Sequence, residues 1–77
     1  MPSHSPTFDT DLSSFGKRVR QLRTERGLSL RWLAQEAGRS YSYLCELELG
    51  KRLPSADTLE RLADVLGTSM DSLWRGE

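Results

Sequence analysis

The chain has 77 residues, enough for one small domain, and its 36% hydrophobic and 29% charged residues are typical of a folded domain with a polar surface. No apolar run approaches the roughly 20 residues that cross a bilayer, and the N-terminal segment lacks the apolar core of a signal peptide. The single cysteine excludes an intramolecular disulfide and fits a reducing compartment. We therefore expect a cytoplasmic protein that does not enter a membrane.

The net charge is zero, but the charges are unevenly distributed along the chain. Residues 15–28 contain five basic side chains and one acidic one, whereas residues 54–77 contain two basic and five acidic side chains. Charges separated by more than about 8–10 Å are largely screened at physiological salt, so a polyanion responds to a local patch and not to the total. The basic segment therefore predicts modest affinity for nucleic acid.

Residues 1–11 contain two prolines and no hydrophobic periodicity, so we interpret them as a flexible tail. A first helix is predicted over about residues 12–26, and Gly27 is suited to ending it. Its inner face is formed by Phe15, Val19 and Leu22. This helix carries most of the basic segment.

The segment that follows predicts two short helices joined by a tight turn. The spacing i, i+3, i+4, i+7 predicts a helix over 30–37 that is capped by Ser29. Its buried face is formed by Leu30, Leu33, Ala34 and Ala37. Gly38 interrupts this pattern, and Ser40 is placed to cap a second helix over 41–49. Two such helices form a helix-turn-helix, whose second helix usually enters the major groove of DNA.

Pro54 cannot lie inside a helix and therefore closes the loop that follows. A fourth helix, capped by Ser55, is predicted over 56–66. A fifth, which Thr68 and Asp71 begin, is predicted over 69–75. No segment shows the alternating pattern of a strand. The predicted fold class is all-α, a compact five-helix bundle in which residues 12–77 form a helix-turn-helix domain.

Helical geometry separates two faces of the helix over 41–49. Leu44 and Leu47 set the inward direction, and at about 100° per residue Ser42 and Glu46 then point outward. The N-terminal outward residues of a groove-bound helix reach base edges. The candidates for base contact, including one residue of the turn, are Arg39, Tyr41, Ser42, Tyr43, Cys45 and Glu46.

Two of these candidates have a second interpretation. A carboxylate that faces DNA repels phosphate, so Glu46 either accepts a hydrogen bond from a base or holds Arg39 or another basic group in position. Cys45 is either a small side chain beside the core or a redox-sensitive thiol on the recognition helix.

Glu48 projects within about 40° of Leu44 and therefore faces the core. A buried carboxylate needs a partner, because an uncompensated buried charge costs several kcal/mol. Arg23 flanks the apolar face of the first helix and is the natural candidate. We predict a structural ion pair between Arg23 and Glu48.

From Phe15 to Trp74 the sequence resembles the lambda-repressor/Cro-type helix-turn-helix regulators, the family that includes xenobiotic-response-element-type regulators. The resemblance is carried by VRQLRTERGLS, LAQEAG, LCELELGKRLPS and LERLADVLGTSMDSLW. It implies a dimer that binds a palindromic operator. The implied phosphate contacts are Ser29, Arg31, Lys51, Arg52 and backbone N–H groups near Leu49 and Gly50. The implied dimer interface, in the last helix, is Met70, Leu73 and Trp74.

Two positions depart from the family pattern. Leu30 stands where a glutamine often contacts DNA, so that contact is absent. Trp32 stands where glutamate is common, and the helical projection points it into solvent. Three explanations remain open for this exposed indole: the N-terminal tail covers it through Phe8, its N–H bonds a phosphate, or it binds a partner protein.

These features predict a sequence-specific regulator, a homodimer on double-stranded DNA, that represses or activates by occupancy. The alternative is a protein-interaction module or antitoxin-type adaptor, which would use Trp32, the tail or Trp74. We reject an enzyme, because there is no catalytic set, no metal-ligand cluster near His4 and no glycine-rich phosphate loop, each glycine being placed at a helix end. No cofactor is expected.

Overall fold

The computed structural model describes residues 7–76, with side chains described from residue 12 onward. Its elements are α1 (Thr7–Glu25), α2 (Leu30–Ala37), α3 (Tyr41–Glu48), α4 (Ala56–Leu66) and α5 (Met70–Arg75). No strand occurs within residues 7–76, and the all-α prediction is confirmed. None of the helices in this range is long and apolar enough to cross a membrane.

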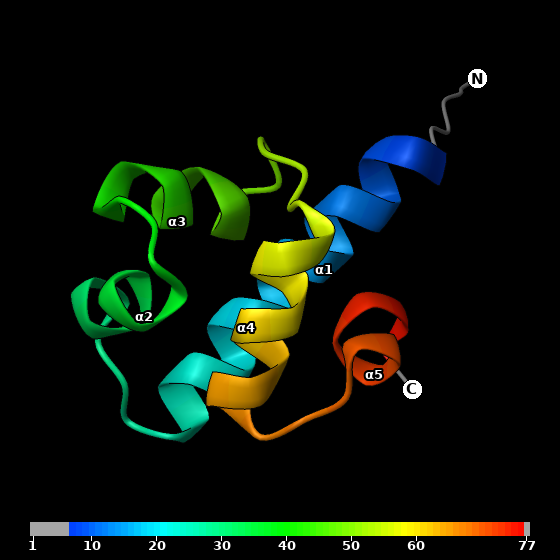
Figure 1. Ribbon diagram of the computed structural model, residues 1–77. Helices are drawn as coiled ribbons and strands as arrows, with labels where there is room; N and C mark the ends of the chain where they lie inside the picture. The colour runs from blue at the N-terminus through cyan, green and yellow to red at the C-terminus, as the bar shows by residue number, and fades with distance from the viewer. Residues whose placement is uncertain (1–6, 77) are drawn as a thin grey trace.

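The helices enclose one apolar core. α2 packs on α3 and α4, whereas α1 packs on α3 and α5, and α4 closes the bundle by packing on α5 (Figure 1). Every helix contributes to the core, whose buried members are Phe15, Val19, Leu33, Ala34, Ala37, Leu44, Leu47, Leu62, Ala63, Leu66 and Leu73. This arrangement leaves α2 and α3 together at one side of the molecule (Figure 1).

A serine cap begins each of the last four helices. The hydroxyl oxygens of Ser29, Ser40 and Ser55 accept hydrogen bonds from the backbone N–H three residues later, as predicted. The prediction for α5 is wrong by one residue, because Ser69 is the cap. Thr68 instead donates its backbone N–H to the carbonyl of Ala63 and so belongs to the end of α4.

The turn between α2 and α3 depends on Gly38. This residue adopts φ 68° and ψ 32°, a left-handed conformation in which a Cβ would be strained. The N–H groups of Gly38 and Arg39 donate to the carbonyls of Gln35 and Ala34, which closes α2. Ser40 then starts α3 directly, so the two helices are joined by three residues.

α1 begins at Thr7, five residues earlier than predicted. Pro6 is the last helix-breaking residue of the sequence before this segment. The predicted start of the first helix, at about residue 12, is therefore wrong by five residues, and residues 1–6 lie outside the described range. The first turns of α1 project beyond the other helices (Figure 1).

Gly16 is a second departure from expectation, since it is buried inside α1 and not at a helix end. A Cβ placed on Gly16 would lie 2.5 Å from the carbonyl oxygen of Leu47 and 2.6 Å from that of Glu48. Only glycine allows the last turn of α3 to approach the backbone of α1 this closely. The end of α3 therefore rests directly on α1.

Candidate nucleic-acid interface

The structure divides α3 into the two faces that helical geometry predicted. Leu44 and Leu47 are completely buried, whereas Ser42 is exposed and Tyr41 keeps 47% of its surface. Tyr43, Cys45 and Glu46 are partly exposed, on the flanks of this outward face. The five predicted base-contact residues of α3 thus all keep exposed surface.

Basic side chains lie at both ends of this face. At its N-terminal end, the guanidinium carbon of Arg31 is 5.0 Å from the centre of the Tyr41 ring, which links α2 to the start of α3. At its C-terminal end, Lys51 and Arg52 are exposed in the loop before α4. The predicted phosphate-binding side chains therefore flank α3 on two sides, as a helix lying in a groove between two phosphate strands requires.

The backbone N–H groups of Leu49 and Gly50, which the resemblance implied as phosphate contacts, already have partners within the chain. The N–H of Leu49 donates to the carbonyl of Cys45 at 3.1 Å, and that of Gly50 donates to the carbonyl of Leu47 at 3.1 Å. Lys51 closes the helix in the same way through the carbonyl of Glu46. These N–H groups complete the C-terminal turn of α3 and are already used, so phosphate contact in this region falls to the side chains.

Arg39, the turn residue among the predicted base contacts, is held by α4. Its Nε donates to the hydroxyl oxygen of Thr58 at 2.9 Å, and its Nη2 lies 3.9 Å from the carboxylate of Asp57. Thr58 is completely buried and had not been singled out. It precedes Leu62 by one helical turn, so its place on the inner face of α4 was available from the sequence.

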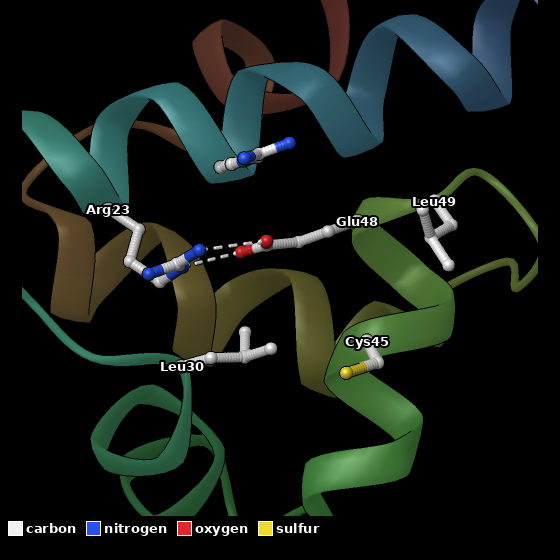
Figure 2. A pocket seen from close by; sticks show the side chains of 6 residues that line it. Arg23, Leu30, Cys45, Glu48 and Leu49 are labelled. Carbon is white, nitrogen blue, oxygen red and sulfur yellow. Dashed lines mark hydrogen bonds and ion pairs between the residues drawn. The ribbon is translucent and has the colours of Figure 1, made fainter.

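The predicted ion pair between Arg23 and Glu48 is confirmed. The Arg23 side chain donates from Nε to Oε2 at 2.7 Å and from Nη2 to Oε1 at 3.1 Å, as Figure 2 shows. Hydrogen bonding to Glu48 raises the pKa of Arg23 above its ordinary value, against the opposing effect of burial. A further bond from Nη1 to the carbonyl of Leu28 ties the loop before α2 to the same side chain.

A hollow of about 220 Å³ opens beside this ion pair. Its walls come from α1, the start of α2 and α3, and are formed by Arg20, Arg23, Leu30, Cys45, Glu48 and Leu49. The sulfur of Cys45 points toward it, on the side of α3 that faces α1 (Figure 2). No group of side chains in the described range could hold a metal ion.

The predicted dimer interface in α5 needs one correction. Leu73 is completely buried in the core, so it cannot contact a second subunit. Trp74 is partly buried, with its ring 5.1 Å from that of Phe15, and Met70 remains 38% exposed. The resemblance implied these three residues as a dimer interface, but the fold covers most of the apolar side of α5 within one chain.

Arg18 was not identified from the sequence, yet it fastens α5 to α1. Its Nε donates to the carbonyl of Leu73 at 2.7 Å, and its Nη2 donates to the carbonyl of Trp74. A signal was present, because Arg18 lies three residues after Phe15 and four before Leu22, on the apolar face of α1. A cation in such a position calls for acceptors from another element.

Trp32 is 42% exposed on α2, as predicted. Phe8, which was expected to cover the indole, has a side chain that is not among those the structure describes. The backbone of residues 7–11 forms the first turns of α1, at the end of the molecule away from α2 (Figure 1). The path of this backbone does not bring residues 7–11 to α2.

Comparison with known proteins places this geometry in a family. A family model described as a helix-turn-helix domain matches residues 14–73. The HTH-type transcriptional regulator DdrOP3 of Deinococcus deserti is 43% identical over 60 residues, which are 78% of this chain and 46% of that protein. The chain thus spans less than half the length of this relative.

Two solved structures are similar in fold and sequence. The restriction-modification controller protein C.AhdI from Aeromonas hydrophila superposes with a TM-score of 0.79 and 39% identity, covering 83% of this chain and 97% of that one. SinR, the master regulator for biofilm formation, was solved in complex with DNA. It gives a TM-score of 0.72 and 40% identity over 77% of this chain and 95% of the SinR chain. The chain belongs to the helix-turn-helix family of lambda-repressor/Cro-type transcriptional regulators.

Proposed function

We propose that the chain is a transcriptional regulator that binds double-stranded DNA sequence-specifically, as a homodimer, with α3 in the major groove. The observation that carries this proposal is the exposed face of α3 between basic side chains of α2 and of the loop after α3. The similarity to SinR, which was solved in complex with DNA, supports it.

Each group of residues has a distinct role in this proposal. Tyr41 and Ser42 lie at the N-terminal end of α3 and contact base edges, with Tyr43 and Cys45 beside them. The phosphate contacts are Ser29, Arg31, Lys51 and Arg52. Met70 and the exposed edge of Trp74 contribute to the dimer interface. The operator is then palindromic, with half-sites about 34–36 Å apart.

Selection from a random DNA library tests the proposal. The protein is expected to enrich a motif with two-fold symmetry at low salt. Tyr41→Ala combined with Ser42→Ala serves as the matched variant, because both side chains are exposed and their loss leaves the core intact. That variant should fold normally and lose the motif. Absence of any enriched sequence with the unmodified protein at low salt would contradict sequence-specific binding.

A protein-interaction module is the second candidate, favoured by the exposed Trp32 and by the zero net charge. Trp32 is not one of the residues assigned to DNA contact above, and an indole that keeps 42% of its surface is suited to a protein partner. The same selection separates the two functions. A module that does not bind DNA enriches nothing, whereas a regulator enriches its operator with or without Trp32→Ala.

A further inference from the structure

Base contact was one of two interpretations of Glu46 on α3. In the structure its carboxylate is already hydrogen-bonded to an arginine of the same chain. Its Oε1 accepts hydrogen bonds from Nη2 of Arg52 at 2.8 Å and from Nε of Arg52 at 3.2 Å. Both side chains remain about half exposed, with 49% of Arg52 and 46% of Glu46 open to solvent. The pair therefore lies on the surface that α3 and its following loop present together.

The guanidinium group of Arg52 lies over the aromatic ring of Tyr43. The guanidinium carbon of Arg52 is 5.0 Å from the centre of the Tyr43 ring, and that of Arg39 is 5.7 Å from the same ring. Arg39 is in turn held by the buried hydroxyl of Thr58. The loop residue Arg52 is thus connected through an aromatic ring to the core-facing side of α4.

We propose that Glu46 is a positioning residue, which promotes DNA binding by holding Arg52 against Tyr43 and toward the phosphate backbone, and which contacts no base itself. This inference rests on the proposed DNA-binding function. Arginine has five N–H donors, and the two bonds to Glu46 leave three for a phosphate. An arginine ordered before binding loses less rotamer freedom on binding, which strengthens its contact.

The pair also explains how a carboxylate is tolerated on the DNA-facing side. An unpaired carboxylate there would repel phosphates, whereas the positive charge of Arg52 lies 2.8 Å from Oε1 of Glu46 and offsets it. Both hydrogen bonds from Arg52 go to Oε1, so only Oε2 of the paired carboxylate is left for a cytosine amino group. The geometry thus favours the positioning role over direct base contact.

A double-mutant cycle tests the proposal on the duplex that the unmodified protein selects. Glu46→Ala should weaken binding roughly threefold to tenfold, and Arg52→Ala should weaken it at least as much and lower the salt dependence by about one phosphate contact. In the Arg52→Ala background, Glu46→Ala should change the Kd by less than about twofold. Glu46→Gln, whose amide oxygen can still accept from Arg52, should recover part of the loss.

Glu60→Ala removes the same charge from an exposed position on α4 and should leave the Kd nearly unchanged. An effect of Glu46→Ala that persists fully without Arg52 would establish a direct contact and overturn the proposal. Tighter binding by Glu46→Ala would overturn it too, since Glu46 would then compete with phosphate for Arg52. A changed base preference in Glu46→Ala but not in Arg52→Ala would also overturn the proposal, because it would show that Glu46 contacts a base.

A measurement without DNA separates this inference from the function on which it rests. The Nε–H signal of Arg52 in NMR spectra should exchange slowly with water in the unmodified protein and faster in Glu46→Ala. Equal exchange in both would show that Glu46 does not hold Arg52, whatever the protein does with DNA. Slow exchange together with no DNA binding would instead reject the proposed function, and with it the role of the pair in binding.

Discussion

Arg23 and Glu48 join α1 to the end of α3 through two parallel hydrogen bonds, with only 14% and 7% of their side chains exposed. Because the pKa of Arg23 is raised, its contribution to stability is complete below the pKa of the unfolded chain and is lost only as the pH rises through the folded value. That value lies far above neutrality. The contribution of the Arg23 charge is therefore constant between neutral and mildly alkaline pH.

Arg23→Met should destabilise the domain by about 3 kcal/mol, because it leaves the Glu48 carboxylate buried without its partner. Urea unfolding followed by circular dichroism measures the change. The double variant Arg23→Met with Glu48→Leu replaces both charges by apolar groups and should regain most of the loss. Equal stability of the single variant and the unmodified protein would show that the pair is not structural.

Gly16→Ala should destabilise the domain by about 2 kcal/mol or more, although alanine normally favours a helix interior. The added Cβ would lie 2.5 Å from the carbonyl oxygen of Leu47 and force α3 away from α1. Gly27→Ala is the matched control, since nothing lies within 4 Å of its Cβ and only its φ of 68° is strained. The control should cost about 1 kcal/mol, measured by the same unfolding curves.

Arg18→Met should loosen α5, because it removes the donors to the carbonyls of Leu73 and Trp74. We expect a loss of about 1–2 kcal/mol in global stability. Amide hydrogen exchange should accelerate in residues 70–75 more than in α2 or α3. Lys17→Met, at the neighbouring exposed position, should change neither quantity. Uniform acceleration in all helices would argue against a local fastening role.

Hydrophobic spacing and capping residues were sufficient to predict α2, α3 and α4, because each of these helices begins after a serine cap and carries a regular apolar stripe. The start of α1 was missed because residues 7–11 carry no such stripe and their helix continues outside the core. The Arg23–Glu48 pair was predictable, since a carboxylate on an inward face demands a cation and α1 offered one nearby.

Other features depend on tertiary structure that spacing does not encode. The apolar side of α5 was recognised, but whether Leu73 is covered by its own chain or by a second one depends on how α5 docks on α1. The partner of Glu46 comes from a loop, whose path is not set by periodicity. Gly16 was overlooked because its purpose becomes visible only when α3 is placed against it.

Lys51→Ala should weaken DNA binding about equally on all sequences and lower the slope of log Kd against log salt by about one contact. Lys51 is exposed in the loop after α3, and its proposed role is to contribute charge to phosphate binding without reading bases. Fluorescence anisotropy over a salt series measures the slope. Arg75→Ala, which removes one exposed positive charge from α5, should leave the slope unchanged.

Met70→Glu should weaken the proposed homodimer by about tenfold or more, because it places a charge in an apolar contact between subunits. Met70 is 38% exposed in the single chain, so the substitution should leave the fold intact. Sedimentation equilibrium gives the dimer constant, and the melting temperature at low concentration reports the fold. An unchanged dimer constant would place the interface elsewhere.

The C-terminal end of α3 is fixed to α1 at two places, at Gly16 by backbone contact and at Arg23 through Glu48. These two positions are seven residues apart, about two helical turns. Because α3 is held at two points near one end, it cannot rotate about its own axis relative to α1. Side chains on its outward face can therefore be exchanged without changing the angle at which they are displayed, so under the proposed function new target sequences are accessible through substitutions on that face alone.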